Sequence, residues 1–232
     1  MTKPAAREAL GGRMAARAGL LDAWSHTLGA DEDLVWRAVL HLYADKWRAP
    51  RPDEVAAEAG IAGDHVAALL RGLQRRDLVG LDPGSGAIRH AYPFTESATG
   101  HQVKFRGHSL YALCAIDALG IAGMYGTDVL VRSPCRSCGE TVHVATADKG
   151  RKLRDVAPAG AVVWYDFAFF GSAAASSCTA TAFFCSDDHL RRWLDGQTPR
   201  REGARLTMDE ALEMGRAIFG PVLAEAKVQE GR

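Results

Sequence analysis

The sequence has no excess charge of either sign and no long apolar run. Its 28 Lys and Arg residues are matched by 28 Asp and Glu residues, so the 232-residue chain has a formal net charge of zero. A chain without a net field has no general attraction for nucleic acid or for an anionic membrane surface. No uncharged apolar run reaches the roughly 18 residues that a membrane-spanning helix needs, and no secretory-type apolar segment follows residues 1–7. We therefore expect a cytoplasmic protein without a membrane partner.

The sequence also lacks the even set of cysteines that a disulfide framework requires. The five cysteines are Cys114, Cys135, Cys138, Cys178 and Cys185. In a reducing compartment, such an odd set favours reactive or metal-binding thiols. The hydrophobic fraction of 47% is typical of a globular chain with a real core.

The first part of the chain has the periodicity of helices. Apolar residues recur at helical spacing over residues 13–28 and again over residues 34–43. The acidic residues 31–33 precede the second of these helices, where they complement the helix dipole. Its predicted buried stripe consists of Leu34, Val35, Ala38, Val39 and Leu42.

A helix-turn-helix and a hairpin are predicted next. Their helices span residues 53–60 and 65–75, and the hairpin strands span residues 78–81 and 87–92. We therefore expect a winged-helix-like region over residues 1–92. DNA binding is disfavoured because Arg71, Arg75 and Arg76 lie mainly at the end of the second helix, whereas Asp64 and His65 occupy its groove-entering start.

Residues 93–232 are expected to form a core of antiparallel strands packed with helices, which makes the fold class α+β. Ser109 is the expected N-cap of a helix that carries Cys114 and Asp117, with Gly120 and Gly123 punctuating it. Residues 149–156 read as a charged loop or short helix. Strands are predicted over residues 101–105, 127–132, 141–146, 161–165 and 178–185, and helices from Asp187 and over residues 208–223.

Cys114 and Asp117 are the first candidate site. At a spacing of three residues, both side chains would lie on one face of the expected helix. A buried carboxylate is disfavoured unless it is paired, hydrogen-bonded or used, so the pair suggests a thiol and acid site. The alternative is a buried core thiol beside a carboxylate that accepts from a backbone amide. No local signature selects a histidine base among His101, His108, His143 and His189.

Cys135 and Cys138 form the second candidate site. A Cys-x-x-Cys turn between two strands, followed by Gly139, is the knuckle that supplies half of a structural zinc site. The other half could be Cys178 with Cys185, or a histidine such as His143, but the sequence holds no second Cys-x-x-Cys. Buried thiols acting as small apolar groups are the favoured alternative.

Two segments resemble the organomercurial (alkylmercury) lyase family. Tyr111–Leu119 is similar to the family's signature helix, and Ser177–Phe184 is similar to its second cysteine strand, including the paired phenylalanines. The order of further segments also agrees: the helix-turn-helix-like region, the turn at residues 133–135, the segment 158–160 and the helix after Ser186. The resemblance covers most of residues 30–195.

The resemblance implies a reaction and a set of site residues. Cys114 and Cys178 would bind mercury as thiolates, and Asp117 would act first as base and then as acid. The carbon–mercury bond would be cleaved by protonolysis to a hydrocarbon and Hg(II). No organic cofactor is implied, small external thiols or a mercuric reductase would receive the metal, and Cys135 would be structural. The chain departs from the family at Thr179, where relatives often have a second cysteine, and in the added Cys138 and Cys185.

The resemblance carries a geometric expectation and leaves two other functions open. The sulfurs of Cys114 and Cys178 should lie close enough to share one metal ion, with an Asp117 oxygen beside them. We expect the packing of Trp164, Phe167 and Phe183 to shape the pocket for the organic group. The alternatives are a metal-responsive winged-helix DNA-binding regulator and a metal-binding homologue without lyase activity.

Overall fold

The structure is a computed structural model that describes residues 3–16 and 28–223. The helix expected over residues 13–28 falls mostly outside the described residues. The helices are α1 (Pro4–Ala16), α3 (Ala30–Lys46), α4 (Pro52–Ala59), α5 (Gly63–Arg75), α6 (Ala115–Tyr125), α7 (Ser177–Ala180), α8 (Asp187–Asp195) and α9 (Met208–Phe219). No helix in the described part of the chain is long and apolar enough to cross a membrane.

The strands form two antiparallel sheets. The larger sheet has the order β1-β2-β3-β5-β4-β6-β7-β8 and the smaller has the order β10-β9-β11. The expected α+β class is therefore confirmed. The strands are β1 (Val79–Leu81), β2 (Ile88–Ala91), β3 (Phe94–Thr95), β4 (Gln102–Phe105), β5 (His108–Ala112), β6 (Leu130–Pro134), β7 (Thr141–Ala147), β8 (Lys152–Ala157), β9 (Val162–Asp166), β10 (Ala182–Phe184) and β11 (Gly203–Thr207).

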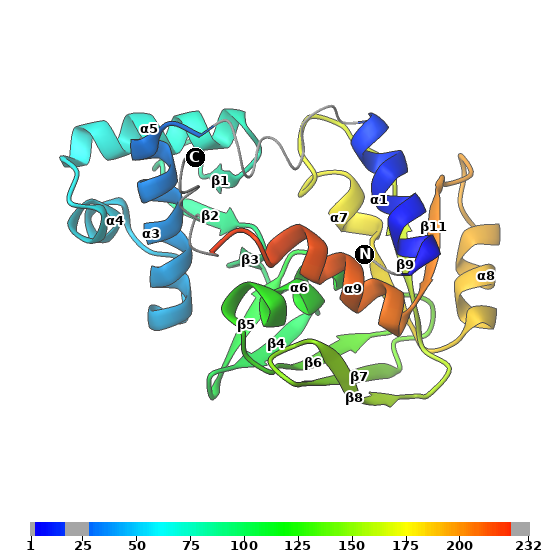
Figure 1. Ribbon diagram of the computed structural model, residues 1–232. Helices are drawn as coiled ribbons and strands as arrows, with labels where there is room; N and C mark the ends of the chain where they lie inside the picture. The colour runs from blue at the N-terminus through cyan, green and yellow to red at the C-terminus, as the bar shows by residue number, and fades with distance from the viewer. Residues whose placement is uncertain (1–2, 17–27, 224–232) are drawn as a thin grey trace, which may run out of the picture.

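Helices α3, α4 and α5 lie together at one end of the molecule (Figure 1). The Glu54 carboxylate accepts from the Arg51 N–H at 2.8 Å and caps α4, which ends at Gly60 with φ 69°. Leu34 is 49% exposed, so its assignment to the buried stripe is wrong, whereas Val35, Ala38, Val39 and Leu42 are buried. The likeness of this region to a winged helix stays a prediction.

The larger sheet runs through the expected domain boundary at residues 92 and 93. Strand β2 pairs with β3 through His90 and Thr95, and β3 pairs with β5 through Phe94 and Ala112. The hairpin after α5 is therefore hydrogen-bonded into the core. The division into two regions stays a prediction.

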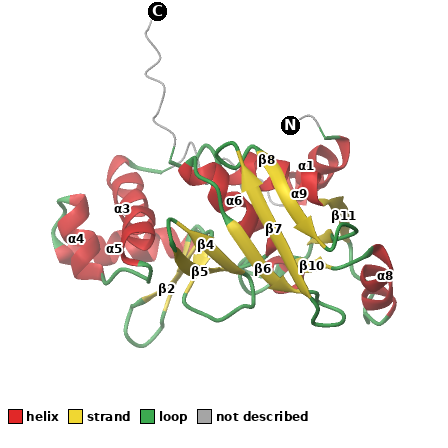
Figure 2. Cartoon of the chain, turned by 90° about the horizontal axis from the view of Figure 1, so that it is seen from below, coloured by secondary structure: helices red, strands yellow, loops and turns green. Residues whose placement is uncertain are grey.

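Helix α6 is the centre of the core. Of its eleven residues, nine are buried, and it packs against α9 above the strands β6 to β8 (Figures 1 and 2). A Cβ atom on Gly215 of α9 would lie 2.8 Å from the Gly120 backbone N. A Cβ atom on Gly120 would in turn lie 2.2 Å from the Phe219 ring. Gly120 therefore allows two helices to approach closely, and the expectation that it punctuates α6 is wrong.

Three local expectations are wrong, and in the first two strand pairing overrode local propensity. Residues 108–112 form β5 rather than the start of a helix, so Ser109 is not an N-cap. Residues 152–157 form the edge strand β8 rather than a loop or helix. Residues 178–185 divide into the end of α7 and the strand β10. Helix α8 begins at Asp187 as expected, and the Ser186 hydroxyl caps it.

Candidate functional site

Cys114 is the N-cap of α6 rather than a residue on its face. Its backbone is extended, with φ −151° and ψ −179°, and its Sγ accepts from the Asp117 N–H at 3.5 Å. The next residue, Ala115, donates its N–H to the carbonyl of Thr181 at 3.3 Å. The Cys114 side chain is only 4% exposed. The sulfur is therefore held where β5 ends and α6 begins.

Asp117 lies in the first turn of α6 and is 4% exposed. A carboxylate at this position is stabilised by the N-terminal end of the helix dipole. Its Oδ2 accepts from the Cys178 Sγ at 3.7 Å. The three-residue spacing of Cys114 and Asp117 thus brings them together through capping geometry and not through a shared helical face.

Cys178 lies in the four-residue helix α7, not in the strand that was expected. Its N–H donates to the Ala173 carbonyl at 2.9 Å, and the Thr181 N–H donates to the Ser177 carbonyl at 2.8 Å. The Thr181 hydroxyl in turn accepts from the Asp166 N–H of β9 at 3.1 Å. Helix α7 is thereby fixed against the smaller sheet.

The structure brings the three sequence-predicted residues together. The Sγ atoms of Cys114 and Cys178 and a carboxylate oxygen of Asp117 all lie within 4.8 Å of one another, and all three side chains are buried. Burial, a hydrogen bond with Cys178 and the nearby Asp117 carboxylate together raise the pKa of the Cys114 thiol well above its usual value. Cys114 is therefore a thiol at neutral pH before anything binds. A soft cation between the sulfurs would favour the thiolate.

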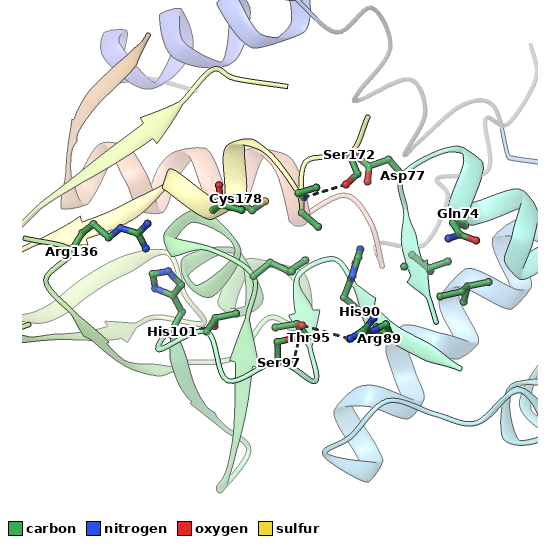
Figure 3. Close-up of a pocket in the computed structure, with 18 residues that line it drawn as sticks. Gln74, Asp77, Arg89, His90, Thr95, Ser97, His101, Arg136, Ser172 and Cys178 are labelled. Atoms are coloured by element: carbon green, nitrogen blue, oxygen red, sulfur yellow. Dashed lines mark hydrogen bonds between the residues drawn. The ribbon is translucent and has the colours of Figure 1, made fainter. Parts of the chain in front are cut away.

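Cys178 forms part of the wall of a cavity of about 590 Å³ (Figure 3). His101 and Arg136 lie near it at one end, and Arg89 and His90 lie at the other. Burial, with a smaller effect of Arg136, lowers the pKa of His101 to about 4, so its ring is neutral at physiological pH. The described lining residues do not include Trp164, Phe167 or Phe183, so these three side chains do not shape the cavity beside Cys178.

A buried polar tether joins the N-terminal region to the segment that carries Cys178. The Tyr92 hydroxyl donates to Asp77 Oδ1 at 3.0 Å and accepts from the Ala174 N–H at 2.7 Å. Asp77 Oδ2 accepts from the Ala173 N–H at 2.8 Å. Sequence reasoning missed both Asp77 and Tyr92. Their partners lie about 80 to 95 residues later, beyond the reach of any local pattern.

A second group of thiols lies outside this site. Cys135, Cys138, Cys185 and His189 place one ligand atom each within 4.8 Å of one another. Desolvation disfavours a charge on Cys135, but backbone N–H groups of Cys185, Cys138 and Ser137 outweigh it and lower the pKa of Cys135 to about 6. Desolvation and the neighbouring thiols raise the pKa of Cys185.

The expected partners of the Cys-x-x-Cys turn were partly wrong. Cys178 belongs to the first site, and His143 is exposed on β7, whereas Cys185 and His189 complete the second group. The Cys-x-x-x-His spacing of Cys185 and His189 was the signal that could have found them.

Three comparisons with known proteins agree. A family model described as alkylmercury lyase matches residues 94–220. An alkylmercury lyase of Staphylococcus epidermidis is 31% identical over 185 residues, which are 79% of this chain and 81% of that protein. One of Bacillus cereus is 31% identical over 134 residues, which are 57% of this chain and 59% of that protein.

The fold comparison extends over nearly the whole chain. A solved structure described as the mercury-bound form of MerB2 superposes with a TM-score of 0.73 and covers 96% of this chain and 100% of that one. The sequence identity is 21%, so this likeness concerns the fold.

Proposed function

The chain belongs to the alkylmercury lyase family, and from that premise we propose that it cleaves the carbon–mercury bond of organomercurials by protonolysis. The observation that carries the proposal is the convergence of two sulfurs and one carboxylate within 4.8 Å in a buried site. Metal–sulfur bonds of about 2.3 Å, as for zinc, allow two sulfurs at this separation to bind one ion. Mercury is softer than zinc and favours thiolate ligands.

The reaction requires a proton to leave Cys114. Because Cys114 begins as a thiol, its proton must leave as its sulfur bonds to mercury. Asp117 lies beside both sulfurs and can accept that proton. The Cys178 sulfur forms the second bond to mercury, and the added electron density weakens the carbon–mercury bond.

The same carboxylate completes the reaction. The departing carbon takes the bond's electron pair and the proton held on Asp117, which yields the hydrocarbon and regenerates the carboxylate. The second thiol proton leaves with the small thiolate that accompanied the substrate. The balance is one organomercury thiolate and two protein thiols giving one hydrocarbon, one free thiol and Hg(II) bound by Cys114 and Cys178. External small thiols then remove Hg(II), and a mercuric reductase is the proposed next recipient.

The test is release of hydrocarbon. Purified protein is incubated with phenylmercury or methylmercury and excess thiol, and benzene or methane is measured. Cys114→Ser and Cys178→Ser should abolish turnover, and Asp117→Ala should lower it by about 10²- to 10⁴-fold, the usual contribution of general acid–base catalysis. Asp155→Ala on the exposed face of β8 is the matched carboxylate control and should keep the wild-type rate.

Solvent deuterium tests the protonolysis step itself. In D₂O, the benzene released should carry one deuterium, because the proton on Asp117 derives from exchangeable thiol hydrogens. Stoichiometric mercury binding without hydrocarbon would instead identify a metal-binding homologue. Activity of Cys114→Ser equal to that of wild type would exclude the mechanism. Family membership does not favour the DNA-binding alternative.

A further inference from the structure

We propose that Cys135, Cys138, Cys185 and His189 form a structural zinc site separate from the mercury site. Cys135 and Cys138 lie in the turn between β6 and β7, Cys185 directly follows β10, and His189 lies in the first turn of α8. Their four ligand atoms lie within 4.8 Å of one another. A set of three thiolates and one imidazole is a common donor set of structural Zn²⁺.

Two of the three distances between ligand atoms fit a tetrahedral ion. Zn–S bonds of about 2.3 Å and Zn–N bonds of about 2.0 Å imply S···S edges of about 3.8 Å and S···N edges of about 3.6 Å. The Cys138 and Cys185 sulfurs are 3.7 Å apart, and the Cys135 sulfur is 3.8 Å from His189 Nδ1. The Cys185 sulfur is 2.8 Å from the same nitrogen, so a small movement of the ring would accompany binding.

The backbone around the first two ligands has the form of a metal knuckle. Gly139 has φ 78°, which the tight turn requires, and its N–H donates to the Cys135 carbonyl at 2.9 Å. The Glu140 N–H donates to the Cys138 sulfur at 3.4 Å. Backbone N–H groups directed at sulfur stabilise thiolates, which are the form that binds metal.

The second half of the site is equally fixed. Cys185 ends β10, and the Ser186 hydroxyl caps α8 by accepting from the His189 N–H at 3.3 Å. The cap thus fixes the residue whose ring nitrogen Nδ1 contacts the Cys185 sulfur. Packing of buried thiols as small apolar groups does not account for this arrangement, because Cys138 is exposed and still points at the group. A disulfide does not account for it either, since bonded sulfurs lie about 2.05 Å apart.

Zinc at this place would stabilise the wall of the cavity beside Cys178. Arg136, between the two knuckle cysteines, donates its N–H to the Phe183 carbonyl of β10 at 3.0 Å, and its side chain lines the cavity near Cys178 (Figure 3). The ion would join the β6–β7 turn to β10 and α8. Four protein ligands leave no open position, so the ion would be structural rather than catalytic.

The experiment measures metal content and needs no lyase activity. The full chain is produced in zinc-replete medium, purified with a reducing agent and without chelator, and analysed by elemental mass spectrometry. About one zinc ion per chain is expected. Replacement by Co²⁺ should give the visible absorption of a tetrahedral thiolate site, and removal of zinc with a strong chelator should lower Tm, because metal binding to the folded state stabilises it.

Paired variants assign the ligands. Cys138→Ser and His189→Asn should lower the retained zinc at least about tenfold, because even loss of an outer partner of a metal ligand costs that much affinity. His143→Asn is the matched histidine control, and Cys114→Ser is the matched cysteine control, and both should keep one zinc per chain. Cys138→Ser changes an exposed residue, so it should remain folded by circular dichroism.

Three outcomes would overturn the proposal. The first is a chain that holds no zinc after purification or after reconstitution with zinc sulfate. The second is equal zinc content in the ligand and control variants. The third is an unreduced intact mass two daltons below the thiol form, with Cys138 and Cys185 joined in a disulfide. Because Cys114→Ser should lose lyase activity but keep zinc, failure of this proposal and failure of the proposed function are distinguishable.

Discussion

Replacing Tyr92 with Phe should lower both the free energy of unfolding and the rate of hydrocarbon release, whereas a loss of stability alone would leave the rate of the folded protein unchanged. The Tyr92 hydroxyl joins Asp77 to the segment that leads to Cys178, since it donates to Asp77 and accepts from the Ala174 N–H. Asp77 also accepts directly from the Ala173 N–H, a bond that Tyr92→Phe leaves in place. Burial first, and then nearby Cys178 and Asp77, raise the pKa of Tyr92, so the hydroxyl keeps its proton. Phe removes both hydrogen bonds without changing the volume of the ring.

The magnitude follows from the two bonds. A hydrogen bond to a charged group contributes about 1.5–3 kcal/mol and a neutral one about 1 kcal/mol, so a loss of roughly 3 kcal/mol is expected. The lost hydrogen bonds should leave residues 173–178 less firmly held, and Cys178 should move with them because its N–H is bonded to the Ala173 carbonyl. A sulfur displaced by about 1 Å can slow a reaction roughly 10²-fold, so we expect a tenfold to hundredfold lower rate.

Tyr125→Phe is the matched control. Its hydroxyl donates to the Leu40 carbonyl at 2.7 Å and also joins the N-terminal helices to the core. Tyr125 is the last residue of α6, at the end opposite to the one that Cys114 caps. Urea unfolding and benzene release are measured for both variants. Tyr125→Phe should lose stability and keep its rate. If Tyr92→Phe loses stability but keeps a rate within twofold of wild type, the tether does not position Cys178.

Two other predictions concern stability. Gly215→Ala should lower the free energy of unfolding by about 1–3 kcal/mol in urea, because its Cβ would meet backbone atoms of Gly120 and Ile116. The control Gly11→Ala in α1, where a Cβ would have nothing within 4 Å, should be neutral or stabilising. Equal effects of the two substitutions would refute the packing argument. Burial lowers the pKa of His101 from 6.5 to about 4, so the unfolded chain binds more protons between these values. The contribution of His101 to the free energy of unfolding is therefore fully present above pH 6.5 and falls by roughly 3 kcal/mol as the pH drops towards 4. The variant His101→Gln should lack this pH dependence when urea unfolding is measured across the same range.

Elements with local signals were predictable from the sequence. The Thr207 hydroxyl accepts from the Glu210 N–H and the Glu210 carboxylate accepts from the Thr207 N–H, so residues 207–210 form the capping box that a threonine followed three residues later by a glutamate indicates at a helix start. The acidic residues expected at the start of α3 lie in its first turn. In each case, residues within four positions of one another make the decisive contacts.

Elements that depend on a distant partner were not predictable in this way. The apolar stretch before Cys114 is compatible with a helix or a strand, and its pairing with β4 makes it the strand β5. That pairing turned Cys114 into a helix cap. Gly120 was interpreted as punctuating the helix because its role depends on α9, which lies some 90 residues later.

The sequence by itself determined the chemistry that is available: an odd set of thiols, a carboxylate three residues from one of them, and segments that resemble one family. Only the tertiary structure decided which thiols meet. Cys178 joins Cys114 and Asp117, whereas Cys185 and His189 join Cys135 and Cys138. The physical reason is that a side chain's neighbours across 40 or more residues are set by strand order and helix packing, which local patterns do not encode.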